Sequence, residues 1–154
     1  MKEVSEKGLN SLLVWQKGRQ LVKEVYQHVL PRLPVEEKWV LSDQLRRSVQ
    51  SVPANIAEGY GRFYYQEGIR FSYLARGSLE ETYSHITTAY DLGYIPDDVF
   101  STMVDEIQEL RRILSGYIGF LKRTKRGASE PGNHSVSEAR ETYRTDVTEF
   151  EQSD

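Results

Sequence analysis

The sequence predicts an all-α protein: an antiparallel up-down-up-down four-helix bundle followed by a disordered C-terminal tail. Four segments place apolar residues three and four positions apart, the spacing of one face of an α-helix. The links between these segments are only about four, six and three residues long, and short links force neighbouring helices to run antiparallel. No segment alternates convincingly as a β-strand. We therefore expect a flexible N-terminus over residues 1–10, the bundle over 11–125 and a disordered acidic tail over 126–154.

The first helix is expected from about Asn10 to Leu30. Asn10 or Ser11 can cap it, because a short side-chain oxygen accepts hydrogen bonds from the free amides of the first turn. Pro31 and Pro34 follow the helix and end it. Its apolar face consists of Val14, Gly18, Leu21, Val25 and Val29.

The second helix is expected from about Val35 to Glu58, and Pro53 lies inside it. A proline removes one backbone hydrogen bond and pushes on the preceding turn, which predicts a kink near Gln50–Pro53. A full break, with Ser51 capping a second piece, is the alternative. We favour the kink because the apolar face keeps its phase through Leu41, Leu45, Val49 (or Ser48), Val52 and Ile56.

The third helix is expected from about Tyr65 to Leu92, with Gly93 as its stop. A seven-residue repeat of mostly small residues runs along it, which predicts a seam that lets neighbouring helices approach closely. Leu74, Leu79 and Ile86 flank this seam. Its members are Phe71, Ala75, Ser78, Thr82, His85, Ala89 and Leu92.

The fourth helix is expected from about Pro96 to Arg123. Asp97 and Asp98 in its first turn suit the positive end of the helix dipole, and Lys122 and Arg123 suit the negative end. Its apolar face consists of Phe100, Met103 or Val104, Ile107, Leu110, Leu114, Tyr117 or Ile118, and Leu121.

The composition excludes several classes of function. Of the 154 residues, 38% are hydrophobic and 28% charged, no apolar run could span a bilayer, and Met1–Asn10 lacks the apolar centre of a signal peptide. A cytoplasmic protein is therefore expected. Because there is no cysteine, disulfides, thiolate zinc sites and a cysteine nucleophile are excluded. The net charge is −3, but residues 127–154 alone carry −5, so residues 1–126 carry +2.

The sequence shows no catalytic constellation, so we expect no enzyme, no cofactor and no small-molecule substrate. Two Glu-x-x-x-His pairs occur, Glu24 with His28 and Glu81 with His85. A di-iron site in a helical bundle uses Glu-x-x-His pairs with further inward carboxylates, and these are not evident, so no metal is expected. An unrecognised site at Glu58, Glu81 and His85 is the remaining enzyme hypothesis.

Two polar groupings remain. Asn55, Glu58, Ser78 and Glu81 lie on or beside the apolar faces, which indicates an internal polar network that fixes helix register, or alternatively a binding pocket. Arginines beside aromatic residues can grip phosphates and stack on unpaired bases, or can simply pair with acids. These basic candidates are Arg46, Arg47, Arg62, Arg70, Arg76, Lys122, Arg123, Lys125 and Arg126.

Several motifs resemble, in the same order, those of the four-helix bundle proteins encoded in bacterial 23S ribosomal RNA intervening sequences. The resemblance covers about residues 11–121 and departs at Tyr83, where the family often has another acid. The most distinctive stretch is Ser51–Gly59 (SVPANIAEG). The other matching stretches are Leu13–Gly18, Gln44–Ser48, Arg70–Glu81 and Ala89–Ile95.

The resemblance implies a non-catalytic bundle that assembles into a homo-oligomer, with pentamers the expected form. Related proteins of the same fold bind nucleic acid and a reverse transcriptase as retroelement accessory factors. We therefore expect binding of RNA or of a ribonucleoprotein partner. The alternative is a purely structural assembly module whose arginines make salt bridges between subunits.

Overall fold

The computed structural model describes residues 8–129, which contain four α-helices and no β-strand. The helices are α1 (Leu13–Glu24), α2 (Leu41–Gly61), α3 (Tyr65–Asp91) and α4 (Asp97–Thr124). A 3-10 turn (Leu9–Ser11) precedes α1, and three short helical turns (Val25–Val29, Leu30–Arg32 and Val35–Glu37) connect α1 to α2. Most of the predicted flexible N-terminus and of the predicted acidic tail lies outside the described residues.

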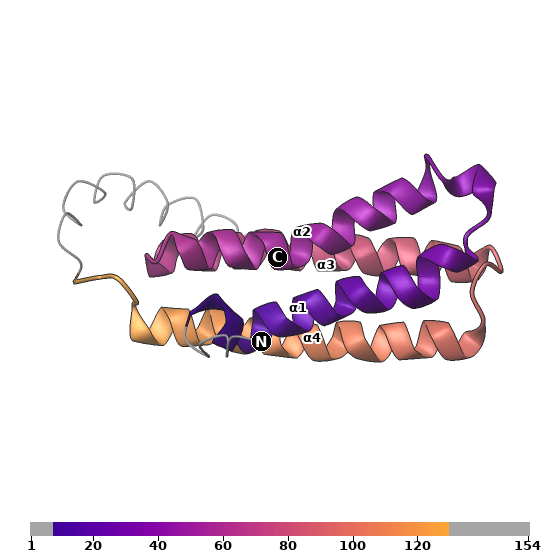
Figure 1. The fold of residues 1–154 in the computed structure, drawn as a ribbon. Coiled ribbons are helices and arrows are strands. Elements are labelled where there is room, and N and C mark those ends of the chain that lie inside the picture. Colours follow the sequence, from indigo (N-terminus) through magenta and orange to yellow (C-terminus); the bar gives the residue numbers. More distant parts are fainter. Residues whose placement is uncertain (1–7, 130–154) are drawn as a thin grey trace, which may run out of the picture.

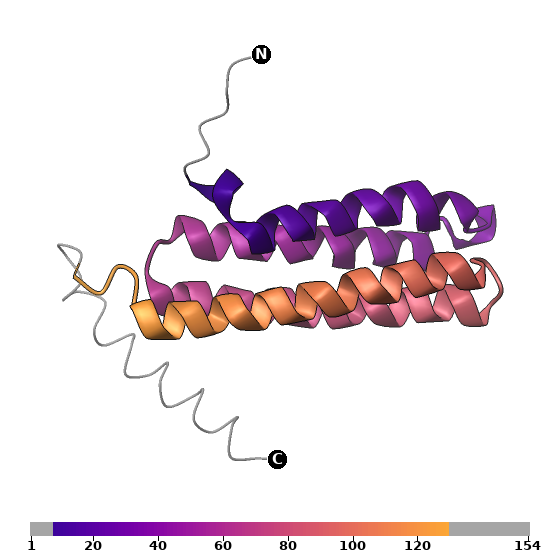
Figure 2. The ribbon, with the colours of Figure 1, turned by 90° about the horizontal axis from the view of Figure 1, so that it is seen from below.

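The four helices lie side by side around one core (Figures 1 and 2). α1 packs against α2 and α4, and α3 packs against the same two helices. Each helix therefore has two neighbours, which together cover its apolar face. The connections between successive helices alternate between the two ends of the bundle (Figure 1).

The predicted apolar faces of the first, second and fourth helices form the core. All five residues of the first face are buried, from Val14 to Val29. On α2 the face is buried from Leu41 to Ile56, and on α4 it is buried at Met103, Ile107, Leu110, Leu114, Tyr117, Ile118 and Leu121. Burial of these three apolar faces removes apolar surface from water and so stabilises the packing of the helices.

On α3, the predicted small-residue seam lies only partly in the core. Its members Ala75, Thr82 and Ala89, spaced by seven residues, are fully buried, which confirms that part of the prediction. The other row of the seam is less buried: Phe71 is 7% exposed, but Ser78 and His85 are half-buried, and Leu92, just after the end of α3, is 55% exposed. The prediction is therefore wrong at Leu92, and Leu79 and Ile86, expected beside the seam, lie fully in the core.

The chain between α1 and α2 is more irregular than predicted. The first helix does not run uniformly to Leu30, because a π-helical turn over Val25–Val29 and a 3-10 turn replace its last part. The second begins at Leu41 rather than Val35. Glu37 accounts for that start: its carboxylate accepts a hydrogen bond from the amide of Leu41 at 3.2 Å and another from the hydroxyl of Tyr94 at 3.1 Å.

α2 continues as a helix through Pro53, so the alternative of a break is excluded. Figure 1 shows a bend near the middle of this helix. Gly18 of α1 lies against the proline ring, and a Cβ atom on Gly18 would come within 3.3 Å of the Cβ of Pro53. The glycine therefore lets α1 pack closely on α2 at the proline.

α2 and α3 are in close contact at Gly59. A Cβ atom at this position would lie 2.8 Å from the Cβ of Phe71 and 3.2 Å from the Cα of Gly68. Such distances are too short for an added methyl group, so the two helices can keep this separation only while residue 59 is glycine.

We expect Gly59→Ala to lower the free energy of unfolding by roughly 1–3 kcal/mol, because the new methyl group overpacks the contact between α2 and α3. Gly61→Ala is the matched control: a Cβ there meets nothing within 4 Å. In a helix, this control change is neutral or stabilising. Urea unfolding followed by circular dichroism measures both variants, and equal stability of the two would refute the close-contact interpretation.

Candidate nucleic-acid interface

Most of the predicted basic candidates gather at one end of the bundle, where α2 ends, α3 begins and α4 ends (Figure 1). The amide of Tyr65 donates a hydrogen bond to the carbonyl of Arg126 at 2.8 Å, which joins the start of α3 to the segment after α4. We call this region the basic end. Its basic residues are Arg62, Arg70, Lys122, Arg123, Lys125 and Arg126.

Arg126 is held by two aromatic rings. Its guanidinium carbon lies 4.2 Å from the ring centres of both Tyr60 and Phe63. Phe63 and Lys125 adopt left-handed backbone conformations, which non-glycine residues rarely do, and they form the turns that bring these groups together. Arg126 and Gly127 therefore pack against the α2–α3 corner, although the disordered tail was predicted to begin at residue 126.

Arg62 and Arg70 are compensated by acids. Arg62 forms an ion pair with Glu58 at 3.0 Å, and both arginines lie 3.9 Å from the carboxylate of Glu67. Both also lie over the ring of Phe71, at 4.8 Å and 5.6 Å. For these two residues the geometry matches the simpler alternative, in which arginines pair with acids and cover the end of the bundle.

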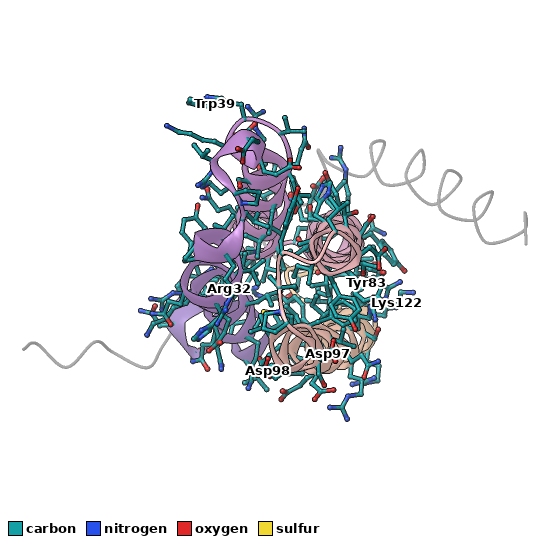
Figure 3. The ribbon with its side chains drawn as sticks, turned by 90° about the vertical axis from the view of Figure 1, so that its right-hand side faces the viewer. Arg32, Trp39, Tyr83, Asp97, Asp98 and Lys122 are labelled. Carbon is teal, nitrogen blue, oxygen red and sulfur yellow. The ribbon has the colours of Figure 1, made fainter. Side chains whose placement is uncertain are left out.

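Lys122, Arg123 and Lys125 differ from those two arginines. Across residues 8–129, no carboxylate lies within ion-pair distance of any of the three. Lys122 lies 5.9 Å from the ring centre of Tyr73, and Figure 3 places it on the same side of the molecule as Tyr83. These three side chains give the basic end its uncompensated positive charge.

Arg76 joins the same side from the middle of α3. Its guanidinium carbon lies 5.2 Å from the ring centre of Tyr73, and it donates a hydrogen bond to the hydroxyl of Ser115 at 3.3 Å. Arg76 and Lys122 therefore share one aromatic ring, which extends the cationic surface from the basic end along the boundary between α3 and α4.

Arg46 and Arg47 do not join the basic end. They lie in the first half of α2, toward the opposite end of the bundle. Arg47 pairs with Asp43 at 3.0 Å and its side chain is 75% exposed, whereas Arg46 is half-buried. The sequence motif that contains this pair therefore does not extend the cationic surface formed by the later residues.

Sequence reasoning missed the ion pair between α3 and α4. Arg111 donates two hydrogen bonds to the carboxylate of Glu80, at 2.6 Å and 2.8 Å, and this pairing raises the pKa of Arg111. Its guanidinium also lies 4.9 Å from the ring centre of Tyr83. Both partners lie outside the apolar faces, so periodicity gave no signal for them.

The four residues of the predicted polar network are not linked to one another. The amide of Asn55 donates to the carbonyl of Ser51, and the carbonyl of Ser78 accepts from the hydroxyl of Thr82. Glu58 and Glu81 are about half exposed and pair with residues four positions later, Arg62 and His85. Each contact lies within one helix, so it cannot set the register between helices.

A buried hydroxyl pair, and not the predicted network, links α2 and α3. The Oγ1 of Thr82 on α3 lies 3.0 Å from the Oγ of Ser48 on α2, within hydrogen-bond distance, and both residues are at most 2% exposed. The Oγ of Ser48 also lies 3.2 Å from the carbonyl oxygen of Leu45. Ser48 and Thr82 were assigned to the apolar stripe and the small-residue seam, and nothing in their spacing distinguished them as a pair.

The Ser48–Thr82 pair can be tested with a double-mutant cycle. We expect Ser48→Ala and Thr82→Val each to cost about 1 kcal/mol in the free energy of unfolding, because each leaves a buried partner with one hydrogen bond fewer. The double variant should cost less than the sum of the two, by at least ~0.5 kcal/mol. Denaturant unfolding measures all four proteins, and strict additivity would contradict a direct interaction.

The two predicted Glu–His pairs form along their own helices, Glu24–His28 at 3.4 Å and Glu81–His85 at 3.3 Å. Within residues 8–129, no group of three or more His, Asp or Glu side chains could hold a metal ion. In the same residues, no helix is long and apolar enough to cross a bilayer.

The fold and its charged end define a class: a small all-α protein of four packed helices with a cation–aromatic surface at one end. The family model of the 23S rRNA-intervening sequence protein matches residues 10–116. The chain belongs to this family. No curated protein matches the chain. The match stops before Lys122, so the uncompensated cations of the basic end lie beyond it.

Proposed function

We propose that the protein is a non-catalytic, homo-oligomeric up-down-up-down bundle, expected to be a pentamer, which binds RNA or a ribonucleoprotein through its basic end. The observation that carries this proposal is the group of three uncompensated cations at the basic end, where Lys122 lies beside Tyr73, and Arg126 lies beside Tyr60 and Phe63. Cations of this kind neutralise phosphates, and exposed rings stack on unpaired bases. Membership of a family described by its origin in ribosomal RNA genes agrees with an RNA ligand.

The cations of the basic end fall into two groups, which differ in whether they already have an acidic partner. Arg62 and Arg70 are paired with Glu67 and would have to exchange that partner for a phosphate. Lys122, Arg123 and Lys125 have no such partner among the described residues, and all three are exposed. These three should therefore supply most of the salt-dependent part of the affinity.

This assignment is tested by the salt dependence of binding to single-stranded RNA. Binding through phosphates releases counterions, so the log of the affinity falls by about 0.7 per log unit of salt for each cation involved. We expect the variant K122Q/R123Q/K125Q to flatten that slope by roughly 2. Arg47→Gln is the control, since Arg47 pairs with Asp43 away from the basic end. Fluorescence anisotropy at several salt concentrations gives both slopes.

If the wild-type chain does not bind RNA even at low salt, the nucleic-acid proposal is wrong. If it binds but the triple variant and Arg47→Gln give the same slope as the wild type, the interface has been placed on the wrong surface. Circular dichroism of each variant establishes that the fold is retained.

A second candidate function is a pure assembly or protein-interaction module, and one observation favours it. Three apolar side chains project from the chain between α1 and α2: Val35 is 78% exposed, Trp39 79% and Val40 61%. Figure 3 shows Trp39 at the outer edge of the molecule. Exposed apolar groups of this size mark interaction surfaces. In this function, Arg46 and Arg47 would make salt bridges between subunits.

Light scattering separates the two functions. If the assembly depends on the α1–α2 connection, Trp39→Ser should lower the molar mass in solution, whereas Leu74→Ser, at a 47% exposed position of α3, should not. The variant R46A/R47A should also lower the mass if these arginines bridge subunits. An unchanged mass in both Trp39→Ser and R46A/R47A would remove this connection and these arginines from the subunit interface.

A further inference from the structure

The hydroxyl of Tyr117 lacks a hydrogen-bond acceptor. Tyr117 lies on α4 with only 9% of its surface exposed, and within residues 8–129 no group accepts a hydrogen bond from its hydroxyl. Burying a polar group without its hydrogen-bond partner is unfavourable, so such a group indicates a missing partner. Burial raises the pKa of Tyr117, so at neutral pH the group is a protonated hydroxyl that needs an acceptor.

The charged group beside this hydroxyl is Arg126, and a guanidinium cannot be the acceptor. Its positive charge and a hydrogen bond from its guanidinium act on Tyr117, and both oppose the rise in the pKa of that residue that burial causes. Arginine has five N–H donors and no acceptor, so two donors face the same region. An acceptor for the tyrosine hydroxyl must therefore come from outside the pair.

The guanidinium is oriented for such a ligand. Its carbon lies 4.2 Å from the ring centres of Tyr60 and Phe63, and stacking on ring faces leaves the N–H edges of the plane available. The carbonyl of Arg126 is held by the amide of Tyr65 at 2.8 Å, so the backbone is fixed as well. A pre-oriented guanidinium edge is suited to an oxyanion with several acceptor oxygens.

We propose that Arg126 and Tyr117 form a binding site for a phosphate group, whose oxygens accept hydrogen bonds from the guanidinium edge and from the tyrosine hydroxyl. The site rests on the proposed function and deepens it, because it makes one phosphate of a nucleic acid the ligand at the basic end. The surrounding charge favours an anion: Lys122, Arg123 and Lys125 are uncompensated among the described residues, and Glu67 is paired with Arg62 and Arg70.

The first test measures thermal unfolding of the full chain in inorganic phosphate and in sodium chloride of equal ionic strength. Phosphate should raise the melting temperature of the wild type, since a ligand that binds only the folded state stabilises it. Tyr117→Phe should weaken phosphate binding about tenfold, since it removes one hydrogen bond to a charged ligand. Without phosphate, Tyr117→Phe should be at least as stable as the wild type, because a buried hydroxyl without an acceptor is gone.

Tyr83→Phe is the matched control. Tyr83 also lies beside an arginine, but that arginine is already paired with Glu80. This variant should keep the full response to phosphate. Arg126→Gln should lose the response, and Arg126→Lys should recover only part of it, because lysine keeps the charge without the planar, stacked donors.

Three results would overturn the site. One is an equal phosphate response in the wild type and in Tyr117→Phe. Another is a wild type that phosphate stabilises no more than sodium chloride does. The third is a Tyr117→Phe variant that is less stable without phosphate, which would mean that the hydroxyl is already satisfied, for example by a buried water.

A second measurement distinguishes a nucleic-acid phosphate from free phosphate. If the ligand is a backbone phosphate, Tyr117→Phe should also weaken binding of single-stranded RNA, and inorganic phosphate should compete with that RNA. A phosphate response without any RNA binding would leave the site standing and overturn the proposed function. RNA binding without a phosphate response would leave the proposed function standing and overturn the phosphate site.

Discussion

The contact between α2 and α3 at Gly59 determines the geometry of the basic end. The two helices touch there because residue 59 has no side chain, and Gly68 and Phe71 occupy the space that a Cβ would need. The chain must then reverse within Arg62–Tyr64, and it does so with Phe63 in a left-handed conformation. That turn presents the ring of Phe63 to Arg126. A wider separation of α2 and α3 would move this ring away from the segment that follows α4.

The core was predictable because burial imposes a simple period on the sequence. On the first, second and fourth helices, residues such as Leu21, Leu45 and Leu114 lie inside as their spacing indicates. On α3, the seven-residue spacing is buried at Ala75, Thr82 and Ala89, but Leu92 follows the last residue of the helix and lies at the surface. Residue spacing alone does not show where a helix ends, so the predicted row continued one residue past Asp91.

The candidate site was only partly predictable, for a different reason. The sequence identified the cations and the aromatic residues of the basic end, but not which cations have acidic partners. Glu67 compensates Arg62 and Arg70 through contacts across a turn and along a helix, whereas Lys122 has no carboxylate near it in the described residues. Such differences depend on side-chain directions at the end of the bundle. The same applies to Tyr117, whose place in the apolar face gave no sign of a buried hydroxyl without an acceptor.

The hydrogen bond from the Tyr65 amide to the Arg126 carbonyl also has a consequence for cooperativity. It joins two parts of the chain that are 61 residues apart, so it exists only when α4 is docked along its full length. The amide of the first residue of α3 would otherwise be open to water, as in an ordinary first helical turn. Its hydrogen-exchange rate therefore reports on docking of the C-terminal end of α4, independently of the stability of the core.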